Sequence, residues 1–165
     1  MAQPARTNDA EPVVARSDVG RTRYEDDVYG WVQEQVASLR PGRIDALDLD
    51  SIAEELSDVG AEQYDKLESA VVIVLVHMLK WDHQPERRSR SWTQSIDEPR
   101  IRIGKQLRKN PSLKSRLAEA LEDGYRIGRV KAAREIKRET RSLPTACPYI
   151  WDDILNRQFE LDADR

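Results

Sequence analysis

Apolar residues recur along most of this chain at spacings of three and four, which is the repeat of an α-helix. The first run predicts a helix over about 24–40, ended by Arg40-Pro41-Gly42. A second helix is predicted from about 48, with Asp48, Asp50 or Ser51 as its N-cap, to Gly60, a natural helix stop. The pattern therefore begins as two amphipathic helices.

The stretch Ala70–Leu79 is apolar on every side of a helix. It lies within a third predicted helix, about 61–83, which Pro85 ends because the proline ring removes a donor and clashes with the preceding turn. A helix that is apolar all round must be covered all round. We therefore expect this helix at the centre of the fold.

Three further helices are predicted after Pro85. The fourth covers about 86–109, and Asn110-Pro111 supplies an N-cap and a first-position proline for a fifth that extends to about 140. Cys147-Pro148 is expected to open a short last helix. The fifth helix carries small residues at four-residue spacing, which predicts close packing within the molecule; they are Ala120, Gly124, Gly128 and Ala132.

These elements predict an all-α fold, a single-domain bundle of five to six helices around the buried central helix at about 61–83. The composition agrees, because 35% charged and 6% aromatic residues suit amphipathic helices better than a sandwich or barrel. The domain is expected over 23–160. Residues 1–22 mix both charge signs with proline and alanine, so we expect a flexible N-terminal tail.

The chain shows no sign of export or membrane insertion. Its N-terminus lacks the apolar core of a secretory signal, and its longest apolar run of about ten residues is half of what a bilayer requires. Cys147 is the only cysteine, so no internal disulfide can form, as is typical of a reducing cytosol. At a helix N-terminus its thiol pKa would be lowered, although a small buried apolar side chain is the favoured interpretation. We expect a cytoplasmic protein with no membrane partner.

Charge is distributed unevenly along the chain. Residues 24–68 hold 13 acidic and 3 basic residues, a net charge of −10, whereas residues 80–141 hold 18 basic and 9 acidic residues, a net charge of +9. Such a chain can pack its acidic helices against its basic ones, or it can offer a basic face to a polyanion. The first interpretation is favoured.

A polar segment succeeds the apolar run, between His77 and Ser95. Helical spacing gathers its residues on one face before Pro85 and on one face after it, so a hairpin at the proline would bring the two groups together. A polar cluster beside an apolar core is where a functional site is expected. The members of this candidate polar site are His77, Lys80, Trp81, Gln84, Arg87, Arg88, Ser91 and Trp92.

Each member also has a structural role available. A lone histidine on an apolar helix, such as His77, is more often a core group with one or two hydrogen bonds than a catalytic group. The cations are more often solvated or paired with acidic helices, and Trp81 and Trp92 more often anchor a core than stack on bases. The structural interpretations are favoured, and the functional ones stay open.

No metal site is predicted, and the residues identify no cofactor. His77 and His83 are six residues apart and point to different faces of a helix, which disfavours a zinc pair. A hairpin at Gly60 would leave Glu55 about 15 Å from His77 along the helix axis. Asp45 and Asp48 would be better placed to meet the histidine, so a carboxylate-rich magnesium site stays open.

Several short motifs together resemble a family known only as domain of unknown function 29, small helical proteins of bacteria. The resemblance implies an all-helical fold over about 24–157 and transfers no catalytic residue, because the family has no established activity. The most specific stretch runs from His77-Met78-Leu79-Lys80-Trp81 through Gln84-Pro85-Glu86-Arg87-Arg88 to Ser91-Trp92. The others are Tyr24-Glu25-Asp26-Asp27 with Trp31, Leu49-Asp50-Ser51-Ile52-Ala53-Glu54-Glu55, Asn110-Pro111-Ser112-Leu113, Glu139-Thr140 with Leu143-Pro144, and Cys147-Pro148.

Three functions compete, and the sequence does not decide whether the protein is an enzyme. The first is a non-enzymatic protein-interaction or self-association module that uses the uneven charge. The second is a nucleic-acid-binding or nucleic-acid-acting protein with a basic cluster at Lys80–Arg90, with or without Mg²⁺. The third is a small-molecule enzyme with His77 as general base. We rank them in this order.

Overall fold

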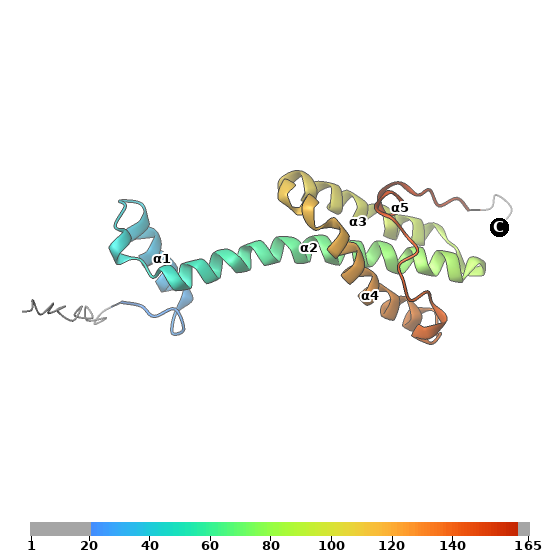
Figure 1. Cartoon of the computed structure of the whole chain (residues 1–165), viewed down its shortest axis with the longest axis horizontal. Helices are drawn as coiled ribbons and strands as arrows, with labels where there is room; N and C mark the ends of the chain where they lie inside the picture. The colour runs from blue at the N-terminus through green and yellow to red at the C-terminus, as the bar shows by residue number, and fades with distance from the viewer. Residues whose placement is uncertain (1–20, 162–165) are drawn as a thin grey trace, which may run out of the picture. The chain divides into compact units, whose positions relative to one another are not determined.

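A computed structural model describes residues 21–161, so most of the predicted tail lies outside its described range. It has five α-helices and no strand within that range (Figure 1). The prediction of an all-α fold is therefore confirmed. None of the described helices has the length and apolarity needed to cross a bilayer. The helices are α1 (Val28–Leu39), α2 (Leu49–His83), α3 (Arg90–Lys109), α4 (Leu117–Glu135) and α5 (Trp151–Asn156), and short 3-10 segments lie at Ile44–Ala46, Pro85–Arg87, Pro111–Arg116 and Thr140–Ser142.

The chain divides into two compact units, Met1–Glu54 and Glu55–Arg165, and the expected single domain over 23–160 stays a prediction. In the first unit, Asp48 joins α1 to the start of α2. Its carboxylate accepts a hydrogen bond from the Trp31 indole at 3.1 Å and another from the backbone N–H of Ser51 at 3.2 Å. Its own N–H donates to the side chain of Gln35. Of the three predicted N-caps, Asp48 is thus the one that caps α2.

The predicted stop at Gly60 is wrong, because α2 runs unbroken from Leu49 to His83. A left-handed backbone is what makes glycine a helix stop, and among the described glycines only Gly42, just after α1, has a positive φ. Within a helix, glycine costs only about 1 kcal/mol relative to alanine, which the helix-forming residues around it offset. The predicted second and third helices are therefore one element.

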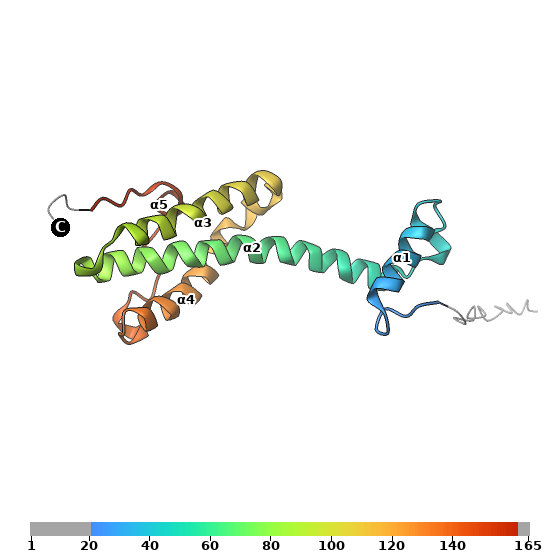
Figure 2. The same ribbon diagram turned by 180° about the vertical axis from the view of Figure 1, so that it is seen from behind.

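The core of the second unit forms around the later turns of α2, as the sequence predicts for the central helix. From Ala70 to Leu79 every side chain is buried except Ile73 and His77. The helices α3 and α4 flank this part of α2 in both views (Figures 1 and 2). The buried side chains that complete the core include Ile96 and Ile103 of α3, Ala120, Tyr125 and Ala132 of α4, and Ile154 of α5.

The stripe of small residues on α4 packs against α2, as predicted. Gly128 is buried, and a Cβ added there would lie 3.3 Å from the Cβ of Leu75 and 3.6 Å from the carbonyl oxygen of Val72. At Gly124 an added Cβ would lie 3.1 Å from a methyl of Val71. The absence of side chains at these positions lets the two helix backbones approach closely.

Two predicted helix starts are wrong. The Asn110 amide does not cap the next helix; it donates back to the carbonyl of Gln106, and Pro111–Arg116 forms a 3-10 turn before α4 begins. The last helix begins at Trp151, four residues after Cys147. The predicted hairpin at Pro85 is present, since α2 ends at His83, Pro85–Arg87 turns the chain, and α3 returns alongside α2.

Candidate functional site

The residues of the candidate polar site lie in three groups around the hairpin at Pro85. In the first group Lys80 of α2 lies between α3 and α4. Its ammonium is 2.7 Å from a carboxylate oxygen of Glu135 and 4.7 Å from the centre of the Trp92 ring, and only 13% of the side chain is exposed. A lysine this well enclosed, with an acid and an aromatic face as partners, joins three helices.

His77 lies one helical turn before Lys80 and is half-buried. Its Nδ1 donates to the carbonyl oxygen of Ile73 at 3.0 Å, which leaves Nε2 as the nitrogen with the lone pair in the neutral ring. Burial lowers the pKa of the imidazole, and the nearby Lys80 ammonium acts in the same direction, against the opposing effects of Ile73 and Glu135. The ring is therefore held neutral, as expected for a histidine packed beside a core.

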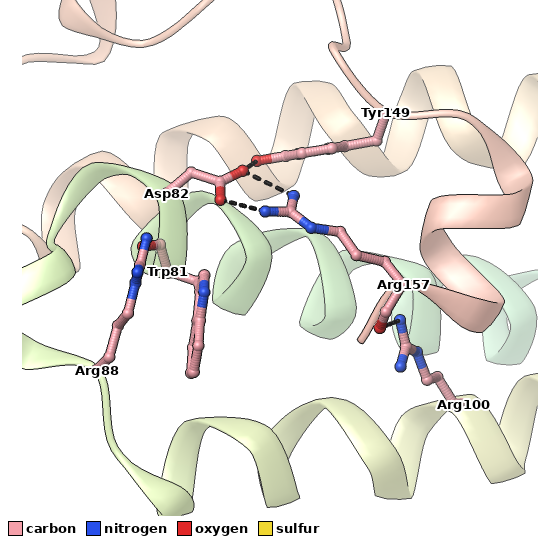
Figure 3. A network of polar contacts seen from close by, with 6 residues as sticks. All are labelled: Trp81, Asp82, Arg88, Arg100, Tyr149 and Arg157. Carbon is pink, nitrogen blue, oxygen red and sulfur yellow. Dashed lines mark hydrogen bonds and ion pairs between the residues drawn. The ribbon is translucent and has the colours of Figure 1, made fainter. Parts of the chain in front are cut away.

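Trp81 and Arg88 form the second group (Figure 3). Trp81 is buried, its ring meets that of Phe159 edge-on at 5.2 Å, and the Arg88 guanidinium lies 5.1 Å from its centre. The Nε of Arg88 also donates to the carbonyl oxygen of Trp81 at 3.0 Å. This carbonyl belongs to the last turn of α2, where backbone acceptors lack helical partners, so Arg88 caps the helix.

Gln84, Arg87 and Ser91 lie around the turn itself. Gln84 is buried and its carbonyl accepts from the N–H of Arg87, whereas the Arg87 side chain is exposed. The Ser91 hydroxyl is 2.9 Å from that of Ser89, and its carbonyl accepts from the hydroxyl of Ser95. These contacts shape the first turn of α3.

An ion-pair network beside Trp81 was missed by the sequence prediction (Figure 3). Asp82 accepts two hydrogen bonds from the Arg157 guanidinium, one of them at 2.9 Å, and a third at 2.8 Å from the hydroxyl of Tyr149. Burial raises the pKa of the Asp82 carboxyl, but Arg157 and Tyr149 outweigh it, so the net shift is downward. Burial, and then the carboxylate of Asp82, raise the pKa of Tyr149. The three groups therefore act as one unit that ties residues 149–157 to the end of α2.

Arg100 of α3 secures the same C-terminal segment from the other side. Its guanidinium donates to the carbonyl oxygens of Ile154, Asp153 and Arg157 at 2.7, 2.9 and 2.9 Å. Two of these acceptors, Asp153 and Ile154, belong to the short helix α5, and Arg157 follows it directly. The carbonyl of Asp153 also accepts from the backbone N–H of Arg157. The bonds from Arg100 explain how a helix of six residues is held in place.

Glu55, one of the acidic residues considered for a site at His77, does not lie near it. Glu55 and His77 are 22 residues apart on the unbroken helix α2, which is about 33 Å at 1.5 Å per residue. The hairpin that would have brought them within about 15 Å does not form. Within residues 21–161, no three His, Cys, Asp or Glu side chains are grouped so that they could hold a metal ion.

The charged side chains of this region are mainly bonded to other residues of the protein. Lys80, Arg88 and Asp82 each direct their charge or hydrogen bonds to partners within the second unit. Asp82 stands inside the His77–Trp92 motif, but its partners Tyr149 and Arg157 are 67 and 75 residues away, a distance that no local pattern bridges. The sequence could have flagged Asp82 only as an acid next to a buried tryptophan.

A family model described as "Domain of unknown function DUF29" matches residues 23–160. The chain therefore belongs to the DUF29 family, as the resemblance of its motifs implied. No curated protein and no solved structure matches the chain.

Proposed function

We propose that this chain is a protein-interaction module that self-associates head to tail, with the acidic, apolar surface of its first unit on the basic face of α4 in a second copy. The proposal is supported chiefly by the exposed apolar side chains of the first unit. Tyr29 is 77% exposed, and the buried side chains of α1 are only Trp31 and Gln35. The exposed apolar residues of the unit are Val28, Tyr29, Val36, Leu39, Ile44 and Leu49.

The surroundings of these side chains are acidic. Residues 21–54 hold eight acidic and four basic residues. Exposed apolar side chains among charged ones are typical of a surface that meets another protein. The excess of acidic residues favours a partner whose own apolar residues are surrounded by cations.

The chain itself supplies such a surface on α4. Ile127 and Val130 are exposed, as are Lys131 and Arg134. Their spacing, with steps of three, four and seven residues, places all four on one face of the helix. This basic, apolar face complements the first unit, and because the two faces differ, the contact between copies would be heterologous.

Sedimentation of the full chain over a concentration series tests the proposal. We expect the mean mass to rise with concentration at low salt and to fall when salt is added, because the contact joins opposite charges. Tyr29→Ser and Val130→Ser should each return the chain toward the monomer. Ile101→Ser, at another exposed apolar residue on α3, is the matched control and should leave the mass unchanged.

A mixture of the two variants gives a sharper result. A heterologous contact needs one intact face from each copy, so Tyr29→Ser and Val130→Ser chains should recover a 1:1 complex that neither forms alone. A monomer at every concentration, or a mixture no heavier than its components, would contradict the proposal.

The nucleic-acid alternative draws less support from the basic cluster at Lys80–Arg90. Lys80 is paired with Glu135, and Arg88 is engaged at the end of α2. Arg87 and Arg90 are exposed, and two cations give only a weak affinity for phosphates, with a shallow dependence on salt. Titration with single- and double-stranded DNA at two salt concentrations distinguishes the two functions.

A further inference from the structure

A groove of about 770 Å³ lies in the second unit, between α4 and residues 145–151. This volume is within the range of small-molecule sites, about 300–1,000 Å³. Its walls are rich in aromatic and aliphatic side chains, among them Leu121, Tyr125, Tyr149 and Trp151. It is separate from the candidate polar site, and its residues are not those of the proposed contact face on α4.

The polar atoms of the three aromatic rings are already satisfied inside the protein. The hydroxyl of Tyr125 donates to the carbonyl of Pro144 at 2.7 Å, the hydroxyl of Tyr149 to Asp82 at 2.8 Å, and the indole of Trp151 to the carbonyl of Leu117 at 2.7 Å. The rings therefore contribute apolar surface to the groove. The same bonds fix both walls, so the groove exists before any ligand enters.

The charged side chains that line the groove belong to α4. Arg126 and Arg129 line it together with one acid, Glu122, so cations exceed acids by one. Arg129 uses Nε and Nη2 on the carbonyl of Leu143, at 3.2 and 2.9 Å. Arg126 pairs with Asp123 at 2.8 Å, but 71% of its side chain is exposed, and such a surface pair is worth little and exchanges readily. Arg126 is thus the guanidinium available to an anion.

We infer that this groove binds a small organic acid, an aliphatic or aromatic body with a single carboxylate. The body lies among Leu121, Tyr125 and Trp151, and the carboxylate is received by Arg126, whose planar guanidinium matches a carboxylate in a bidentate pair. Aromatic walls with few polar groups fix the class of ligand, and the arginine selects an anion over a neutral or cationic molecule of the same size.

The only cysteine of the chain, Cys147, lines the groove and reports on its occupancy. The rate of Cys147 alkylation by iodoacetamide is measured on the full chain at one pH, with octanoate, octan-1-ol or octylamine as probe. The probe concentration needed to slow the reaction should be lowest for octanoate, higher for octan-1-ol and highest for octylamine. Dilute protein keeps the chain monomeric, so this result does not depend on the proposed self-association.

Two pairs of variants complete the test. Arg126→Gln should weaken protection by octanoate about fivefold and leave octan-1-ol unchanged, whereas Arg138→Gln, at an exposed arginine just after α4 and outside the groove, should change neither. Ala118→Phe should fill the groove and remove protection by octanoate, and Ala61→Phe on the exposed side of α2 should not. Equal protection by the three probes, no protection by octanoate, or equal effects of the two arginine variants would overturn the inference.

Discussion

The early and late turns of α2 have similar apolar spacing and opposite environments. Leu56 is 67% exposed and Val59 is also exposed, although they are three residues apart and lie on one face. Leu75 and Leu79, four residues apart, are completely buried. The repeat of apolar residues marks a helix face that requires a cover, and only the arrangement of neighbouring elements decides whether the same chain provides it.

The first unit resembles the early turns of α2 in this respect. Most of its apolar side chains are not covered by α1 or by the 3-10 turn at Ile44–Ala46, and few of its side chains are buried. The second unit resembles the late turns, with a continuous core from Tyr64 to Ile154. We interpret this contrast as a division of roles, in which one unit supplies stability and the other supplies a surface for association.

The strongest way to break this comparison is to truncate a leucine in each half of α2. Leu75→Ala should lower the free energy of unfolding by about 3 kcal/mol, because it removes buried methyl groups and leaves a cavity. Leu56→Ala, at an exposed position of the same helix, should change it by less than about 0.5 kcal/mol. Urea unfolding of dilute monomer measures both, and equal effects would contradict the described burial.

A second prediction compares two glycines within helices, one packed against a neighbouring helix and one with no neighbour beside it. Gly128→Val should cost about 2 kcal/mol, because the added side chain meets Leu75 and Val72 across the helix contact. Gly60→Val is the matched control, since nothing lies within 4 Å of its added Cβ. It should be neutral or slightly stabilising, and thermal unfolding distinguishes the outcomes. A neutral Gly128→Val would mean that α4 does not pack closely on α2.

The Asp82 network predicts a pH dependence. Asp82→Asn should cost about 1–2 kcal/mol near neutral pH, since it removes charged hydrogen bonds to Arg157. The folded pKa of Asp82 is lowered, so its contribution is present above the unfolded carboxyl pKa of about 4 and is lost as the pH falls through the lower folded value. The variant should therefore lose less stability on acidification than the wild type. If the free energy of unfolding fell equally in the variant and in the wild type as the pH is lowered, Asp82 would not be held by these partners.

The smallest expected effect tests the candidate polar site. Lys80→Gln should cost about 1 kcal/mol or less, through its pair with Glu135 and its contact with Trp92. Arg87→Gln, at an exposed cation of the same segment, should leave the unfolding midpoint unchanged. If Lys80→Gln left the unfolding midpoint unchanged but weakened binding of DNA, Lys80 would instead belong to a functional site.

Periodicity was sufficient to predict the helices, the buried run at Ala70–Leu79, the hairpin at Pro85 and the close packing at Gly128. It failed at Gly60, because a glycine stops a helix only where the backbone turns left-handed, and the backbone at Gly60 stays helical. Local spacing also predicted a helix start at Cys147-Pro148, but the helix begins at Trp151. Burial raises the pKa of the Cys147 thiol, which agrees with the favoured interpretation of an apolar side chain and not with the alternative of a lowered pKa.

The candidate site shows the same limit. Spacing predicted that polar residues from the two sides of Pro85 would lie near one another, and the Lys80 ammonium lies 4.7 Å from the centre of the Trp92 ring. Spacing could not predict the partners Glu135, Tyr149 and Arg157. Glu135 lies 55 positions after Lys80, and Tyr149 and Arg157 lie 67 and 75 positions after Asp82. Side chains within a few turns of each other are fixed by the helix repeat, whereas these partners are fixed only by how the helices pack.

Amide hydrogen exchange of the full chain as a function of its concentration tests the division of roles most directly. Exchange in α1, Val28–Leu39, should slow as the concentration rises, because the apolar surface of the first unit becomes covered by another copy. Exchange in Ala70–Leu79 should be slow and independent of concentration. If exchange in α1 is the same at every concentration, the exposed surface of the first unit is not an interface and the division of roles is wrong.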